Sequence, residues 1–251
     1  DVPRRIDREV VALIPTARDA SALIALVPGA KDGNLWGAAG AVTNDFKVDG
    51  ISVNHPGVGG DFLRLSRDWV EAVEIRGVGA GAEFGNFQGG VVNALTRTGT
   101  NTRTATLRAY VEAERLTATN LELEEQGSEQ VARTEVSGEA SGAIRRDRLF
   151  YFVGGQLVDR AFRAPDLASS APGDFLRARE SNREVRGIGK LSWARAVGER
   201  LDLILGGTTN NVGNAGLNGL DAVAALPNVR ASSAWYEASW RRVISPRTAV
   251  E

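Results

Sequence analysis

From residue 104 onward, small or apolar side chains alternate with polar ones, and this pattern restricts the possible folds more than any other. In one segment the alternating sets are Ala105, Leu107, Ala109 and Val111 against Thr106, Arg108, Tyr110 and Glu112, and in another Leu201, Leu203 and Leu205 against Arg200, Asp202 and Thr208. A period of two is typical of a β-strand whose two faces meet different surroundings. The segments are roughly 10 to 13 residues long, and a tilted strand needs about 9 to 11 residues to cross a bilayer. They predict transmembrane strands.

The links between these segments are alternately short and long. Short turns are predicted at 144–147, 195–199 and 244–247, and long polar links at 114–130, 160–182 and 211–230. Outer-membrane barrels have short periplasmic turns and longer outer loops. The sequence therefore predicts antiparallel strands that cross a membrane six times, with a seventh strand that begins near Thr248.

Aromatic residues add a third indication of a membrane. Tyr151, Trp193 and Trp240 fall on the apolar face of their strands, each within a few residues of a short turn. Tyr and Trp collect where a ring can lie at the edge of the hydrocarbon and its polar atom in water. These three residues are predicted to form a periplasmic aromatic girdle.

Composition excludes several classes of function. The formal net charge of −1 argues against a nucleic-acid surface, which is normally basic. The absence of cysteine excludes disulfides, thiolate metal sites and a cysteine nucleophile. No apolar run is long enough for a transmembrane helix, and the N-terminus shows no signal peptide. Because methionine is absent even at position 1, we expect a processed or excised piece whose export signal lies upstream.

The first 100 residues differ from the rest and predict a small α+β unit. Apolar spacing predicts helix over residues 1–30, followed by a Gly/Ala-rich loop at 33–42. Strands are predicted at 46–53, with a sharp turn at Asp49-Gly50, and at 70–76 and 91–97. The polar segment 98–103 is the predicted boundary between domain 1–100 and domain 101–251.

Several short motifs in this unit occur in an order that resembles the plug domain of TonB-dependent outer-membrane receptors. They are VDG at 48–50, VEIRG at 73–77, Phe84-Gly85, GGVVN at 89–93 and Thr96. Residues 14–30 and the segment SGEASGAIRRDRLFYFVGG at 137–155 resemble the subgroup that carries a carboxypeptidase-regulatory-like domain ahead of the plug. Two positions depart from the usual pattern: Val78 stands where many members have Pro, and Phe84 where Tyr is frequent.

The resemblance implies an α+β plug followed by about six or seven strands of a barrel that has about 22. It implies an energy-coupled receptor in the outer membrane of a Gram-negative bacterium, surrounded by lipid, that imports a small solute, glycan or peptide without a cofactor. TonB and its inner-membrane complex would pull on a segment upstream of residue 1. A plug held by hydrated polar contacts, without an apolar seal, would suit such gating. Asn54, His55, Asp61 and Phe62 are the predicted ligand contacts.

Other readings of individual residues are less favoured. Gly77, Gly79, Gly81 and Ala82 fit a dinucleotide pattern, but Gly85, Gly89 and Gly90 preclude the helix it requires. His55 is the only histidine, so a zinc site or a catalytic triad would depend on this one loop residue. We therefore expect no metal site and no catalytic residue, hence no enzyme.

Charged residues are assigned structural roles. The acidic cluster Glu122, Glu124, Glu125 and Glu129 is expected to be a solvated outer loop and not a cation site. Polar faces of the strands are expected to pair with the plug or with neighbouring strands, through Arg108, Arg133, Glu135, Glu139, Arg186 and Lys190. The alternative for the whole chain is a secreted β-rich adhesion or structural protein, in which a second sheet would bury Leu201, Leu203 and Leu205.

Overall fold

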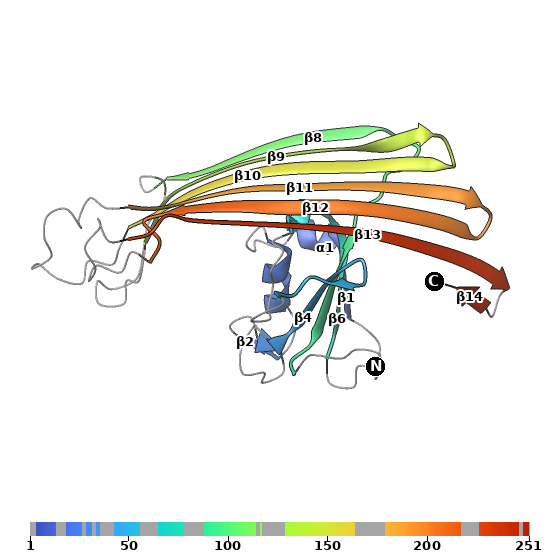
Figure 1. The fold of residues 1–251 in the computed structure, drawn as a ribbon, viewed down its shortest axis with the longest axis horizontal. Helices are drawn as coiled ribbons and strands as arrows, with labels where there is room; N and C mark the ends of the chain where they lie inside the picture. The colour runs from blue at the N-terminus through green and yellow to red at the C-terminus, as the bar shows by residue number, and fades with distance from the viewer. Residues whose placement is uncertain are drawn as a thin grey trace, which may run out of the picture.

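The chain forms a small five-stranded sheet that lies against one face of a long seven-stranded sheet (Figure 1). The computed structural model describes residues 4–13, 19–26, 29–31, 34–35, 43–55, 65–77, 88–113, 116, 129–163, 179–216, 226–245 and 248–250. We call the described residues up to Thr96 the inner unit and the seven-stranded sheet the wall.

The inner unit has short elements in the order β1 (Arg4–Asp7), α1 (Arg8–Leu13), the 3₁₀ helix η1 (Ala20–Leu26), β2 (Ala30–Lys31), β3 (Asn34–Leu35), β4 (Asp45–Val48), β5 (Ile51–Ser52), the 3₁₀ helix η3 (Arg67–Trp69), β6 (Val70–Arg76) and β7 (Val91–Thr96). Its sheet has the order β1-β6-β7-β4-β5. Strands β4 and β7 are parallel, and the other pairs are antiparallel. The predicted strands and the turn at Asp49-Gly50 are confirmed.

Two predictions for the inner unit are wrong. Arg4–Asp7, read as helix, is strand β1, in which Ile6 pairs with Val73 of β6. The spacing of the apolar residues is compatible with a helix, but pairing with β6 supplies hydrogen bonds to the backbone from a distant segment, and tertiary contacts override weak local preferences. The predicted loop 33–42 contains β3, which forms a hairpin with β2.

The wall is an antiparallel meander in which each strand pairs with its sequence neighbours. Its strands are β8 (Thr104–Ala113), β9 (Glu129–Arg145), β10 (Leu149–Arg163), β11 (Arg179–Ala196), β12 (Glu199–Gly213), β13 (Val229–Ser245) and β14 (Thr248–Val250). The predicted short and long links alternate along the chain as expected. Figure 1 shows the strand ends that join at the β9–β10 and β11–β12 turns together at one end of the sheet. The wall strands from β9 to β13 are longer than predicted, at 15 to 18 residues each.

The two faces of the wall differ as the alternation predicted. On the outer face the side chains of Leu107, Leu205 and Tyr236 are 78%, 65% and 87% exposed. On the inner face Phe152, Ile188 and Ile204 are buried against the inner unit. Trp193 and Trp240 lie exposed on the outer face, close to the short turns. Among the described residues no helix is both long and apolar enough to span a bilayer.

Candidate functional site: the contact between the inner unit and the wall

The hydrophobic core continues from the inner unit into the wall. Trp69, at the end of η3, is only 1% exposed and belongs to the same cluster as Phe152 and Ile188. Gly154 makes the approach possible, because a Cβ at that position would lie 2.5 Å from Nε1 of Trp69. Hydrated polar contacts alone therefore do not hold the inner unit: the inner face of the wall, which strict alternation assigns to polar residues, also presents the apolar residues Phe152, Ile188 and Ile204 to it.

Charged pairs surround this apolar patch. Glu139 of β9 forms ion pairs with two arginines: its Oε1 lies 2.6 Å from Nη1 of Arg97 and 3.3 Å from Nη1 of Arg108. The guanidinium of Arg97 also lies over the ring of Phe152, at 5.2 Å from the centroid. Arg108 reaches back to Asp68 of η3 at 3.8 Å. Because these groups are largely buried, removal of one partner would leave an uncompensated charge.

A second charged cluster lies nearer the long links. The buried guanidinium of Arg186 forms two parallel 2.8 Å hydrogen bonds with Glu184 and a third with Asp19, just before η1. Arg160 lies 3.5 Å from Glu184 and 3.9 Å from Asp19. Bidentate arginine–carboxylate pairs fix orientation as well as charge. This cluster positions the start of η1 on β10 and β11.

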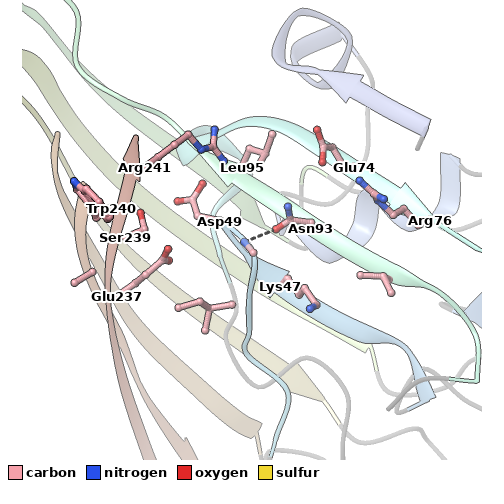
Figure 2. Close-up of a pocket in the computed structure, with 14 residues that line it drawn as sticks. Lys47, Asp49, Glu74, Arg76, Asn93, Leu95, Glu237, Ser239, Trp240 and Arg241 are labelled. Atoms are coloured by element: carbon pink, nitrogen blue, oxygen red, sulfur yellow. Dashed lines mark hydrogen bonds between the residues drawn. The ribbon is translucent and has the colours of Figure 1, made fainter. Parts of the chain in front are cut away.

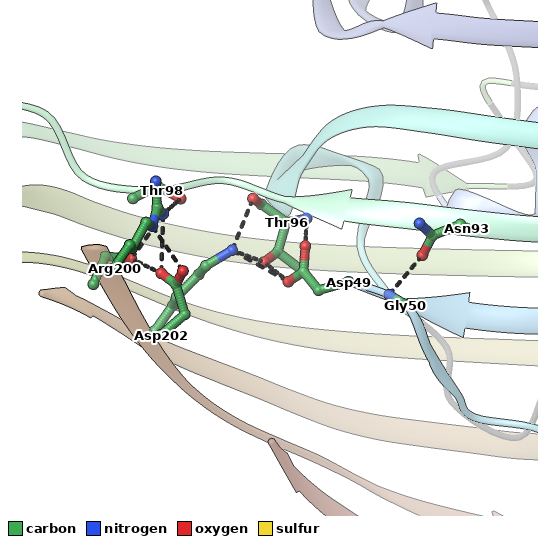
Figure 3. A network of polar contacts seen from close by, with 9 residues as sticks. Asp49, Gly50, Asn93, Thr96, Thr98, Arg200 and Asp202 are labelled. Atoms are coloured by element: carbon green, nitrogen blue, oxygen red, sulfur yellow. Dashed lines mark hydrogen bonds and ion pairs between the residues drawn. The ribbon is translucent and has the colours of Figure 1, made fainter. Parts of the chain in front are cut away.

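A third contact lies nearer the short turns and joins the β4–β5 turn to β11. Lys190 donates to the carboxylate of Asp49 at 3.2 Å and to the hydroxyl of Thr96 at 2.9 Å. Figure 3 shows Asp49 beside Thr96 and, farther along, Arg200 between Thr98 and Asp202. Thus the last residues before the wall are attached to β11 and β12 by side chains.

The predicted pairing of inner-face charges is confirmed. Arg108, Glu139, Arg186 and Lys190 all contact the inner unit or the segment just after it. Arg133 and Glu135 pair with each other, at 2.8 Å, and Gln156 also donates to Glu135. What the sequence did not reveal were the partners Asp19, Asp49, Asp68 and Arg97. Of these four residues, only Asp49 had a recognisable place in the sequence, since it lies in a predicted turn.

A cavity of about 720 Å³ separates part of the inner unit from β13 (Figure 2). Its volume is in the range of small-molecule pockets. Charged residues of both signs line it: Lys47, Arg76 and Arg241, and Asp49, Glu74 and Glu237. Ile51, Leu95 and Trp240 also line it, so the cavity offers partners to water and polar groups beside apolar surface.

The predicted ligand contacts are only partly described. The side-chain amide of Asn54 accepts a hydrogen bond from the backbone N–H of Phe46 at 2.8 Å and donates to Asp45 at 3.1 Å, so it stabilises the open end of the β4–β5 hairpin. His55 follows it and is half-buried. Asp61 and Phe62 lie outside the described residues. Asn54 and His55 thus lie at the end of the β4–β5 hairpin opposite the Asp49-Gly50 turn, which contacts β11.

Other sequence candidates fall largely outside the described part of the chain. This applies to Gly79, Gly81 and Ala82 of the glycine pattern and to Glu122, Glu124 and Glu125 of the acidic cluster, while Glu129 is the first residue of β9. Within the described ranges no group of three or more His, Asp or Glu residues is placed to hold a metal ion.

Comparison with known proteins gives one curated relative and many similar folds. The TonB-dependent transporter Oar of Myxococcus xanthus is 26% identical over 250 residues, covering 84% of this chain and 24% of that protein. The chain thus spans about a quarter of this relative's length. No family model matches the sequence.

Solved structures share the arrangement of the inner unit and the wall. The ferric enterobactin receptor PfeA of Pseudomonas aeruginosa, in complex with enterobactin, superposes with a TM-score of 0.68 at 20% identity, covering 96% of this chain and 38% of that one. The siderophore receptor PirA of Acinetobacter baumannii superposes with a TM-score of 0.63 at 20% identity, covering 95% of this chain and 36% of that one. The outer-membrane transporter YddB of Escherichia coli superposes with a TM-score of 0.62 at 15% identity, covering 84% of this chain and 34% of that one.

These relatives are transporters and receptors, not enzymes, in agreement with the expectation from the sequence. The ordered motifs, the 26% identity to Oar and the common fold make this chain similar to TonB-dependent outer-membrane transporters and receptors, and it shares with them α+β plug-like elements followed by barrel strands.

Proposed function

We propose that the chain is the plug, residues 1–100, and the first part of the barrel, residues 101–251, of a transporter that binds a scarce solute outside the cell and releases it into the periplasm. The inner unit is the plug and the wall is the barrel. The observation that carries this proposal is the two-faced wall: its outer face exposes Leu107 and Leu205, while its inner face is occupied by a separate folded unit.

The alternative of a secreted adhesion protein requires the opposite arrangement. A water-soluble sandwich would bury the face that carries Leu203 and Leu205 against a second sheet. In this fold both side chains are exposed, and the second sheet lies on the other face. The arrangement therefore favours the membrane protein.

Energy for transport would come from TonB and its inner-membrane complex, acting on a segment upstream of residue 1. Ligand would reach the plug from the side of the long links and contact Asn54, His55, Asp61 and Phe62. The relatives support an outer-membrane location. The class of solute, whether small molecule, glycan or peptide, stays open in this proposal.

Spin labels on the full-length protein in lipid vesicles test the central claim. Labels at Leu107 and Leu203 should collide with oxygen dissolved in the acyl chains, and a label at Thr106, on the inner face, should collide with a water-soluble nickel chelate. If the label at Leu107 or Leu203 meets the nickel chelate instead, the membrane assignment is wrong.

The ligand contacts require a separate experiment. For a solute that the full-length protein is shown to import, alanine at Asn54, His55, Asp61 and Phe62 should weaken binding while the barrel still assembles. Alanine at Trp193, on the outer face, is the matched control. Unchanged affinity in all four variants would remove these residues from the binding site.

A further inference from the structure

The turn between β4 and β5 has an unusual backbone that depends on its neighbours. Asp49 has φ 48° and Gly50 φ 101°, both in the left-handed region that side-chain-bearing residues rarely adopt. The backbone N–H of Asp49 donates to the carbonyl of Ala94 at 3.0 Å, and that of Gly50 to Oδ1 of Asn93 at 2.9 Å. The turn is therefore attached to β7 before any contact with the wall is considered.

A single ammonium group of the wall completes this attachment. Asp49 Oδ1 accepts from the backbone N–H of Thr96 at 2.9 Å, and Oδ2 accepts from the Thr96 hydroxyl. Lys190 Nζ lies 3.2 Å from Asp49 Oδ2, 2.9 Å from Thr96 Oγ1 and 3.4 Å from the Thr96 carbonyl oxygen. An ammonium has three donors, and all three have partners here. The Lys190 and Asp49 side chains are only 7% and 14% exposed.

The opposite side of the turn borders open space. Asp49 and Gly50 line the 720 Å³ cavity, whose far side is formed by β13 residues including Glu237 and Ser239. A Cβ built on Gly50 would meet no heavy atom within 4 Å. Figure 2 shows Asp49 and Asn93 on the side of the cavity opposite Glu237 and Ser239. The turn is thus hydrogen-bonded to β7 and held against β11 by the Lys190 ammonium, while its side toward β13 borders the cavity.

From this asymmetry we propose that Lys190 is a positioning residue that keeps the β4–β5 turn against β11, and that its release lets the turn move into the cavity beside β13. After release, water in the charged cavity would solvate the Asp49 carboxylate. The carboxylate would thus exchange its hydrogen bond from Lys190 for hydrogen bonds from water. This movement would open the contact between the turn and β11. Its importance for import rests on the proposed function, but the movement itself does not.

Hydrogen exchange on the full-length protein in lipid nanodiscs, without ligand or TonB, tests the proposal. Lys190→Met removes the charge and keeps the length of the side chain. Loss of one partner of a buried ion pair typically shifts the equilibrium by about 100-fold to 4,000-fold. We expect the amides of Gly50 and Thr96 to exchange at least about tenfold faster, with β6 unchanged. Arg183→Met is the matched control, since Arg183 pairs with Asp159 in an exposed ion pair on β11 and β10.

Two further variants keep the test decisive. Lys190→Arg, which restores the charge, should return exchange toward that of the native protein, a rescue that a loss of packing alone would not show. Asp49→Asn keeps an oxygen acceptor for Thr96 and should increase exchange as Lys190→Met does, even if the latter assembles poorly. Less than a tenfold increase at the turn in both neutral variants, or equal increases throughout the inner unit, would overturn the proposal. Because no ligand is involved, failure of the transport hypothesis would leave this result unaffected.

Discussion

Substitution of Gly154 by alanine should measurably destabilise the packing of the inner unit against the wall. The new Cβ would lie 2.5, 2.7 and 2.9 Å from three atoms of the Trp69 indole. Comfortable contact needs about 3.5 Å, so the ring would have to retreat by about 1 Å. It has little room to do so, because its side chain is buried and its backbone N–H and carbonyl are hydrogen-bonded to Ser66 and Arg97.

The expected cost follows from overpacking of a buried contact. Adding a methyl group to a well-packed site usually costs about 1–3 kcal/mol. Gly155→Ala is the matched control: it is the next residue of the same strand, faces outward, and its Cβ would meet nothing within 4 Å. Gly206→Ala provides a graded comparison. Its Cβ would also lie 2.5 Å from an indole nitrogen, but Trp235 is only partly buried, so the cost should be smaller.

Urea titration of the full-length protein in detergent is the assay. Hydrogen exchange of peptides from β6 would follow unfolding of the inner unit, and gel mobility without heating would follow the barrel. The Gly154→Ala midpoint should fall by an amount equivalent to about 1–3 kcal/mol, while Gly155→Ala stays within about 0.5 kcal/mol of the native protein. Equal midpoints for the two alanine variants would refute the proposed close contact between Trp69 and the wall.

Three other predictions concern different parts of the fold. Glu139→Gln should destabilise the inner unit by about 3 kcal/mol in the same titration, because Arg97 and Arg108 would lose their shared carboxylate. An unchanged midpoint would mean that water stabilises the two guanidinium groups as well as the carboxylate does. Leu107→Arg should lower the folded fraction in vesicles by the equivalent of about 2–4 kcal/mol if the residue lies at the bilayer midplane, and equal tolerance of arginine at Thr106 and Leu107 would contradict the assignment of faces. Gly198→Ala should destabilise the folded protein by about 1–2 kcal/mol and so lower its thermal unfolding temperature, because Gly198 has φ 74° in the β11–β12 turn and a Cβ there would lie 3.3 Å from Val243. An unchanged temperature would show that the turn can adopt another conformation.

The sequence predicts the wall well because its information is local. Alternation along one strand assigns each residue to a face, and the length of a link indicates whether it is a turn. Alternation alone thus places Leu107 and Leu203 on the outer face, and Arg108 and Lys190 on the inner face. The wall is also a meander of neighbouring strands, so its order follows from the order of the chain.

The contact between the two sheets could not be predicted in the same detail. The pair of Asp49 and Lys190 joins residues 141 positions apart, and that of Asp19 and Arg186 residues 167 positions apart. No periodicity specifies such partners. Gly154 illustrates the difficulty: next to Gly155 it looks like a weak point in a strand, and only the position of Trp69 shows that one glycine is needed and the other is not.

The two sheets have no strand in common, which has a mechanical consequence. Tension applied to β1 would pass into β6 and β7 through backbone ladders, in which neighbouring hydrogen bonds share the load. Between the sheets the same tension would meet separate side-chain attachments, such as those of Arg97 and Lys190, which can yield one after another. The inner unit should therefore slip as a coherent body along the wall before its own strands unzip.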